Sequence, residues 1–287
     1  MPMIILSTGS LYTYGLDRVF ALAAKAGYDG LEILVDARWD TRDPFTLKRL
    51  SSEYGMPIAA LHSPFVPGIH GWPSDQLGRL EKTVALAKEV GAGVVVSHLP
   101  LRISGLEIRV MGFGNRRFLL PFPWKRRGPY YHFLNKARVE LLESSSGVMV
   151  ALENMPAMHI LGIKINPFWF NRSGELLRFP HLTLDTTHLG TWGLDPVQVY
   201  GTLKDRVVHV HLSNFDGLEH RSPADGLLNL SGFLGFLGAG GYKGAVSIEC
   251  DPEALDAGNE QLCLEALKRA LSFCRAHLSS SSLRPES

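Results

Sequence analysis

The sequence predicts an α/β fold, the (β/α)8 TIM barrel, because eight short β-branched runs alternate with longer amphipathic segments along the chain. Alternation of this kind is typical of parallel strands joined by right-handed helical crossovers. A chain of 287 residues is long enough for one such barrel. The first run is followed by Ser10-Leu11-Tyr12 and not by the Gly-x-Gly-x-x-Gly of a dinucleotide fold, which also favours a closed barrel.

The eight runs are the expected strands, and each is short and rich in apolar residues. They are Met3–Ser7, Gly30–Val35, Pro57–His62, Gly93–His98, Val148–Glu153, Leu182–Asp185, Val207–Leu212 and Ala245–Glu249. Between them, apolar residues recur at the spacing that predicts helices. The expected helices include Leu16–Ala26, Asp75–Val90, Tyr131–Ser144 and Asn259–His277.

We expect a single barrel domain over residues 1–278 and a disordered, serine-rich tail over residues 279–287. One basic insertion, residues 101–129, breaks the alternation after the fourth strand. Its cations are Arg102, Arg109, Arg116, Arg117, Lys125, Arg126 and Arg127, against the single acid Glu107. Because a loop after a strand emerges at the active-site face of a barrel, we predict either an active-site lid or a mobile or partner-binding insertion.

The composition excludes several function classes. The formal net charge of +1 provides no overall field to attract nucleic acid or an anionic membrane, although a local basic patch stays compatible with DNA. The three cysteines, Cys250, Cys263 and Cys274, have no Cys-x-x-Cys spacing, so a disulfide framework and a thiolate zinc site are not expected. No apolar run reaches membrane-spanning length. These features favour a cytoplasmic protein.

Carboxylate and imidazole side chains stand at the carboxyl ends of six consecutive expected strands. They are His62, His98, Glu153, Asp185, His211 and Glu249, with His188 three positions after Asp185. Burying such groups unpaired would cost on the order of several kcal/mol for each charge. A shared cation removes this cost, because carboxylates and neutral imidazoles are ligands of Zn²⁺, Mn²⁺ and Co²⁺. The sequence therefore predicts a divalent-metal site at this rim of the barrel.

The sequence does not support all of these residues equally as metal ligands. A single histidine at a strand end, such as His62 or His98, is more often a hydrogen-bonded structural residue than a ligand. Four separate strands, however, end at or near a potential ligand, and this coincidence is harder to explain without a metal. The four residues are Glu153, Asp185, His211 and Glu249. His209 lies two residues before His211 and therefore on the same face but deeper, so we expect it in the core or in support of a ligand.

Five strings along the chain carry these residues. They are Ala151-Leu-Glu-Asn-Met-Pro156, Leu184-Asp-Thr-Thr-His188, His209-Val-His-Leu-Ser-Asn214, His220-Arg-Ser-Pro-Ala-Asp-Gly226 and Ser247-Ile-Glu249. In this order they resemble the xylose-isomerase-like barrel superfamily, which holds sugar isomerases, ketose 3-epimerases, inosose dehydratases and endonuclease IV. The resemblance covers nearly the whole chain and implies the superfamily's shared metal site. Its ligands here would be Glu153, Asp185, His211 and Glu249.

The epimerase-like members of this superfamily use two glutamates as acid and base on opposite faces of a sugar carbon. The resemblance thus implies catalytic roles for Glu153 and Glu249, with proton transfer through an enediolate that the metal stabilises. It also implies that His188 and Arg221 contact the substrate.

The endonuclease IV-like members hold three zinc ions. Their additional ligands match His62, His98, His188 and His220. One position departs from the pattern, because Leu218 stands where those members have Asp, so Asp216 or Glu219 would have to supply the missing carboxylate. Zn²⁺ is favoured if all four histidines ligate, whereas Mn²⁺ or Co²⁺ suits the carboxylate-rich shared site better.

These observations favour a divalent-metal-dependent isomerase or epimerase of a sugar or a related small hydroxy-carbonyl compound, phosphorylated or not. Such an enzyme needs one metal ion. The alternatives are an endonuclease IV-like zinc phosphodiesterase acting on abasic DNA, with up to three ions, a metal-dependent dehydratase or lyase, and a non-catalytic barrel. Barrels of this kind often form homodimers, and the sequence does not point to an interface.

Overall fold

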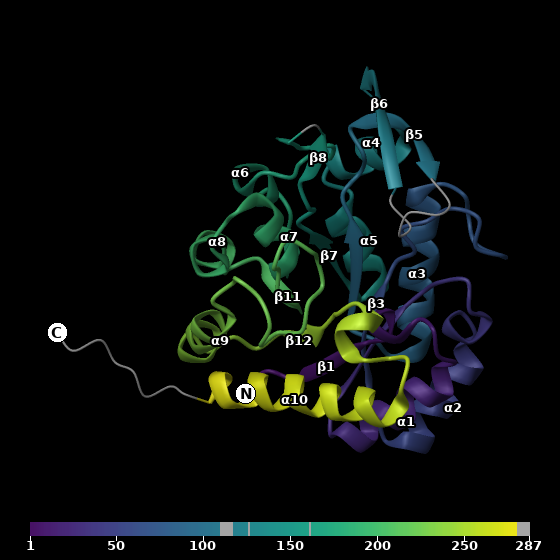
Figure 1. Ribbon diagram of the computed structural model, residues 1–287. Coiled ribbons are helices and arrows are strands. Elements are labelled where there is room, and N and C mark those ends of the chain that lie inside the picture. The colour runs from purple at the N-terminus through teal and green to yellow at the C-terminus, as the bar shows by residue number, and fades with distance from the viewer. Residues whose placement is uncertain (110–116, 126, 161, 280–287) are drawn as a thin grey trace.

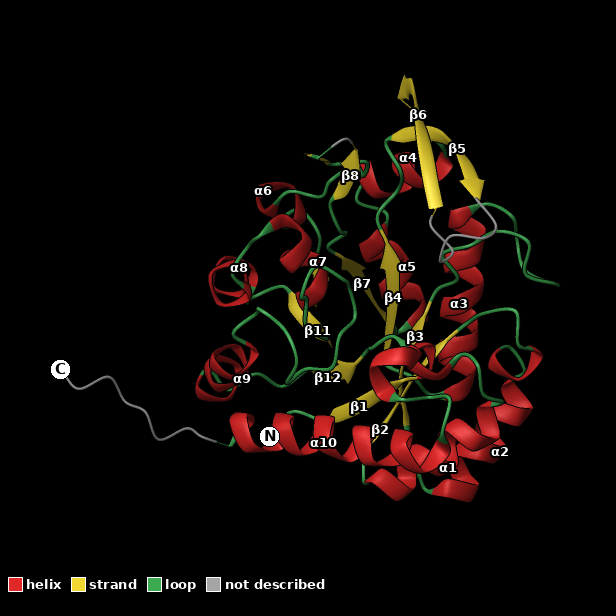
Figure 2. Ribbon diagram, in the orientation of Figure 1, coloured by secondary structure: helices red, strands yellow, loops and turns green. Residues whose placement is uncertain are grey.

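Eight parallel strands close into a barrel in the computed structural model, which describes residues 1–109, 117–125, 127–160 and 162–279. The order around the ring is β1-β12-β11-β10-β7-β4-β3-β2. The barrel strands are β1 (Ile4–Ser7), β2 (Gly30–Leu34), β3 (Ile58–His62), β4 (Val94–His98), β7 (Met149–Glu153), β10 (His181–Asp185), β11 (Val207–Leu212) and β12 (Ala245–Ile248). Figure 2 shows helices surrounding these strands. The predicted (β/α)8 fold is confirmed, and every predicted strand forms.

Helices follow each barrel strand and cover the outside of the ring. They are α1 (Leu16–Ala26), α2 (Pro44–Tyr54), α3 (Gln76–Val90), α4 (Pro129–Asn135), α5 (Val139–Ser146), α6 (Ser173–Leu176), α7 (Thr186–Trp192), α8 (Pro196–Leu203), α9 (Leu230–Ala239) and α10 (Glu260–Leu278). Their starts follow ordinary capping chemistry, since the Asp75 side chain accepts a hydrogen bond from the Gly78 amide at the start of α3. None of the described helices is long and apolar enough to cross a bilayer.

The single helix expected over Tyr131–Ser144 is wrong, because two helices, α4 and α5, share this stretch. Ala137, between them, has a φ of 51°, which a right-handed helix cannot continue through. Leu134 and Val139 are buried on either side of the break. Apolar spacing therefore runs across the junction and hides it from the sequence pattern.

The segment between β4 and α4, predicted as an insertion, contains an antiparallel hairpin. Its strands are β5 (Ile103–Arg109) and β6 (Arg117–Lys125), and the hairpin projects beside α4 at the top of Figure 1. A shorter hairpin, β8 (Met158–Ile160) with β9 (Ile163–Ile165), follows β7. Residues 110–116 and 126 of the insertion and residues 280–287 of the predicted tail lie outside the described residues.

The interior of the barrel contains a small apolar layer that supports the strand ends. It consists of Ala60, Val94, Val96 and Ala151. His62, His98 and Glu153 each follow a member of this layer by two residues on the same strand, so they share its face. The polar side chains at these strand ends therefore lie next to a packed apolar layer of the barrel interior.

Candidate metal centre

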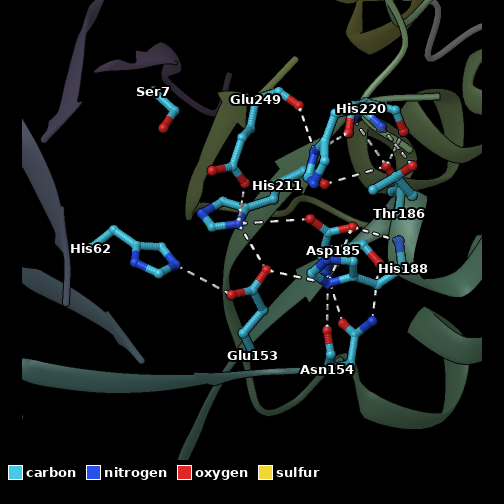
Figure 3. A network of polar contacts seen from close by, with 12 residues as sticks. Ser7, His62, Glu153, Asn154, Asp185, Thr186, His188, His211, His220 and Glu249 are labelled. Atoms are coloured by element: carbon cyan, nitrogen blue, oxygen red, sulfur yellow. Dashed lines mark hydrogen bonds and ion pairs between the residues drawn. The ribbon is translucent and has the colours of Figure 1, made fainter. Parts of the chain in front are cut away.

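The four shared-site residues meet at the carboxyl-terminal rim of the barrel (Figure 3). Glu153 ends β7, Asp185 ends β10, His211 is the penultimate residue of β11, and Glu249 directly follows β12. One potential ligand atom from each of the four lies within 4.8 Å of the others. Parallel strands gather their carboxyl ends at one rim, which is why residues far apart in sequence meet here.

His211 lies at the centre of this group. Its Nδ1 is 2.9 Å from Glu249 Oε2, 3.1 Å from Glu153 Oε1 and 3.8 Å from Asp185 Oδ2. Its Nε2 lies 3.0 Å from Glu32 Oε2, and the same oxygen is 2.5 Å from His209 Nε2. Glu32 is a fully buried residue within β2 that the sequence reasoning missed.

The protonation pattern of His211 fits a bound cation. The carboxylate of Glu32 accepts a hydrogen bond from Nε2, so Nδ1 faces the other three carboxylates. Burial lowers the pKa of His211, but Glu249, Glu32 and Glu153 outweigh it and raise that pKa well above its ordinary range, so without a cation Nδ1 carries a proton. Such an arrangement is repulsive unless a proton or a cation lies between the groups. Asp185 Oδ2 is buried and has no hydrogen-bond partner among the described residues. Three carboxylates and one imidazole form a donor set that suits Mn²⁺, Co²⁺ or Zn²⁺.

A second group joins His62 and His98 to Glu153. The Nδ1 of His62 donates to the Ser63 carbonyl at 2.8 Å, and its Nε2 donates to Glu153 Oε2 at 3.4 Å. Burial lowers the pKa of His62, but the contact with Glu153 outweighs it and raises that pKa. His98 Nε2 is 3.1 Å from the same oxygen. The two oxygens of Glu153 are thus divided, with Oε1 beside His211 and Oε2 beside His62 and His98.

A third group consists of His188, Glu219 and His220. His188 Nδ1 donates to the Asn154 carbonyl at 2.8 Å, and its Nε2 is 3.8 Å from Glu219 Oε2. His220 has a φ of 57°, a left-handed conformation that is costly for most non-glycine residues. Leu218, at the position where the sequence departs from the endonuclease IV pattern, is exposed. Glu219 therefore supplies the carboxylate near this group.

Asn154 holds two elements of the centre together. Its Oδ1 accepts a hydrogen bond from the Asp185 amide at 2.8 Å, and its Nδ2 donates to the Asp185 carbonyl at 3.0 Å. Asp185 in turn caps α7, since its Oδ1 accepts a hydrogen bond from the His188 amide at 2.7 Å. The sequence string around Glu153 contained Asn154, but only the fold reveals this contact.

Among the described residues, Arg221 makes its ion pair with Asp216 and not with a shared-site carboxylate. Its Nε is 3.3 Å from Asp216 Oδ2, and its backbone pairs with Asn214. A substrate contact by Arg221 stays a prediction.

Burial and neighbouring charges shift the pKa values of the acidic groups in this centre in opposite directions. Burial raises the pKa of Asp185 to about 6, although nearby imidazoles act in the other direction. Burial also acts on Glu249, but His211 outweighs it and brings the pKa of Glu249 to about 2. For Glu153, His211 and His98 likewise outweigh burial and hold the pKa well below its ordinary range. Two ionised glutamates therefore accompany the buried Asp185 at neutral pH.

Fold and site together define a (β/α)8 barrel whose carboxyl-terminal rim can hold divalent metal. The chain belongs to the xylose isomerase-like TIM barrel family, whose model matches residues 20–270. An uncharacterized protein of Mycobacterium leprae is 27% identical, with 95% of this chain and 96% of that protein covered. Among solved structures, an L-ribulose 3-epimerase is similar at a TM-score of 0.67 and 17% identity, with 100% of both chains covered. A family 2 AP endonuclease from Brucella melitensis is similar at a TM-score of 0.62 and 18% identity, covering 88% of this chain and 94% of that one.

Proposed function

We propose that this chain is a divalent-metal-dependent isomerase or epimerase of a sugar or a related small hydroxy-carbonyl compound. One observation carries the proposal: Glu153 and Glu249 both contact Nδ1 of His211, at 3.1 and 2.9 Å. Two carboxylates that can exchange protons with a substrate thus share one candidate cation site. The fold-level similarity to an L-ribulose 3-epimerase is compatible with this chemistry.

The two glutamates have different surroundings and therefore different proposed roles. The Glu249 side chain is 17% exposed, whereas that of Glu153 is 1% exposed. Glu249 is the carboxylate that a substrate can reach, so we assign it the removal of a proton from carbon. Glu153 is held by several imidazoles and is the second carboxylate of the pair. A bound divalent ion would polarise the carbonyl and hydroxyl oxygens of the substrate.

A cavity beside His98 supports a small substrate. Its volume is about 410 Å³, which falls in the range of small-molecule sites. Its walls include the aromatic residues Phe65, Tyr130 and Phe168 and the polar residue Gln76. None of the four shared-site residues lines this cavity, which adjoins the centre through His98, and its volume suits a sugar-sized compound.

The test is proton exchange with solvent. Ketoses are incubated with the metal-loaded protein in D₂O, and deuterium at the carbon next to the carbonyl is followed by NMR. We expect one deuterium in each product molecule, loss of the reaction with a chelator, and recovery with Mn²⁺, Co²⁺ or Zn²⁺. A dehydratase would release water and lose a hydroxyl instead. Absence of exchange with every ketose and of any dehydrated product would rule out this class of reaction.

A second candidate is an endonuclease IV-like phosphodiesterase, favoured by the two histidine groups that flank the shared site. Glu219, beside His188 and His220, is the carboxylate available to a multinuclear centre despite the departure at Leu218. This alternative predicts nicking of an abasic-site duplex with steep salt dependence. It also predicts that Glu219→Gln lowers the nicking rate. An intact duplex after prolonged incubation with the zinc-loaded protein would remove this candidate.

A further inference from the structure

A second cavity lies between strand β9 and helices α6, α7 and α8, and we call it the α6–α8 cavity. All of its lining residues fall between positions 154 and 199, and Figure 1 shows α6 and α8 as neighbours at the left of the barrel. Its volume is about 420 Å³, in the range of small-molecule sites. None of the four shared-site residues is among the described residues that line it, so this cavity is distinct from the metal centre.

The walls of the α6–α8 cavity are largely apolar. Met155, Leu176 and Leu189 line it and are buried in the core. Trp192 and Leu194 line it nearer the surface, where Leu194 is 45% exposed. An aliphatic or aromatic body therefore finds apolar partners in this cavity.

Hydrogen bonds hold one wall of this cavity in place. The Asn171 side chain accepts a hydrogen bond from the Met155 amide at 2.9 Å and donates one to the Met155 carbonyl at 2.9 Å. Trp192 Nε1 donates to the same carbonyl at 3.0 Å. Because these three residues all line the cavity, its shape exists before a ligand arrives, which lowers the entropy cost of binding.

Both charged residues that line the cavity are cations. They are Lys164, in β9, and Arg172, directly before α6, and neither has an ion-pair partner in the described part of the chain. The Nζ of Lys164 is 3.6 Å from the place that a Cβ of Gly193 would take, so this ammonium group lies at the end of α7. The described lining contains no acidic residue. An anion inside the cavity is therefore attracted by both cations and repelled by no carboxylate of the wall.

We propose that the α6–α8 cavity binds a small carboxylate that has an aliphatic or aromatic body. The apolar wall packs against the body, and Lys164 and Arg172 attract the carboxylate. A sugar fits this chemistry poorly, because its hydroxyl groups would lose hydrogen bonds to water against the apolar wall. The cavity is thus a second ligand site, and its occupancy does not depend on the function proposed for the metal centre.

Calorimetric titration of the metal-loaded protein with a panel of carboxylates tests this proposal. The panel contains hexanoate, octanoate, benzoate and phenylacetate. We expect at least one of them to bind at one molecule per chain with a Kd below about 1 mM. The primary alcohol with the same carbon skeleton should bind at least about fivefold more weakly, because it lacks the charge.

Two variants place the ligand in the cavity. Lys164→Gln/Arg172→Gln should weaken binding of the carboxylate at least about fivefold and leave binding of the alcohol within about twofold. Leu194→Asp should also weaken binding of the carboxylate, because it adds a negative charge to the wall. All three side chains are exposed, so the fold should persist, and circular dichroism checks this.

Lys204→Gln/Arg206→Gln is the matched control. Both residues are exposed, follow the far end of α8 and are not part of the cavity lining, yet the change in net charge is the same. The affinity for the carboxylate should stay within about twofold of that of the unaltered protein.

Three results would overturn the proposal. They are equal affinities for the carboxylate and its alcohol, an unchanged affinity in Lys164→Gln/Arg172→Gln, and no saturable binding of any member of the panel. A carboxylate held by a metal ion would keep its affinity in that double variant and is thus distinguished from one held in the cavity. The titration involves no ketose, so its outcome is independent of whether the proposed function is correct.

Discussion

Glu249→Gln is expected to lower turnover of the sugar substrate by about 1000-fold without unfolding the protein. Glutamine has nearly the same size but cannot accept a proton from carbon at neutral pH. It also removes a negative charge 2.9 Å from His211 Nδ1, where the candidate cation site lies. The measurement is kcat from deuterium exchange, together with circular dichroism and the melting temperature.

The control for this prediction is Glu253→Gln. Glu253 is exposed, in the short turn after β12, and four residues from Glu249, so the same chemical change should leave kcat within about twofold. Full activity of Glu249→Gln would contradict the two-glutamate mechanism. Reduced activity in both variants would indicate a general effect of charge near the rim.

Glu32→Gln is expected to weaken binding of Mn²⁺, Co²⁺ or Zn²⁺ by about 10- to 100-fold. The Oε2 of Glu32 accepts hydrogen bonds from Nε2 of both His211 and His209, and this arrangement directs Nδ1 of His211 toward the candidate cation site. A neutral amide removes the charge that supports both imidazoles. The affinity is measured by competition with a chromophoric chelator, and the absorption spectrum of bound Co²⁺ reports the ligand geometry.

Thr183→Val is the matched control for Glu32→Gln. Thr183 is buried beside His209 in the neighbouring strand, and its hydroxyl has no hydrogen-bond partner among the described residues. Valine keeps the shape and removes only the hydroxyl, so metal affinity should not change. If Glu32→Gln binds Co²⁺ with the affinity and spectrum of the unaltered protein, Glu32 does not position His211.

The barrel and the shared site were accessible from the sequence because both depend on a repeated pattern. Each strand of the shared site has a polar residue at or beside its carboxyl end after an apolar run, and barrel closure gathers the strand ends whatever their separation in the chain. The pattern alone therefore predicts that Glu153 and Asp185 lie together. Their geometry around His211 agrees with that prediction.

Glu32 could not be found in the same way. It stands inside the apolar run Gly30–Leu34, and its partner His209 is 177 positions away. A carboxylate within a strand has no local signature of the histidine that it will meet. The contact exists only because β2 and β11 both direct side chains into the closed barrel.

Turn geometry explains the other differences between the sequence-based predictions and the structure. The left-handed Ala137 ends α4 within a continuous apolar pattern, so spacing alone predicted one helix. The left-handed His220 shapes the loop in which Glu219, and not Leu218, approaches His188. Such single-residue conformations arise from tertiary contacts and leave no periodic signal in the sequence.

Metal content tests the central claim most directly. The untagged protein is purified without chelator and its metals are counted by elemental mass spectrometry, with Asp185→Asn measured in parallel. We predict at least one Mn²⁺, Co²⁺ or Zn²⁺ per chain and a clear loss in the variant, because Asp185 Oδ2 is buried without a hydrogen-bond partner among the described residues. A protein that retains no divalent metal, and whose melting temperature is the same with chelator or with added metal, would contradict the account.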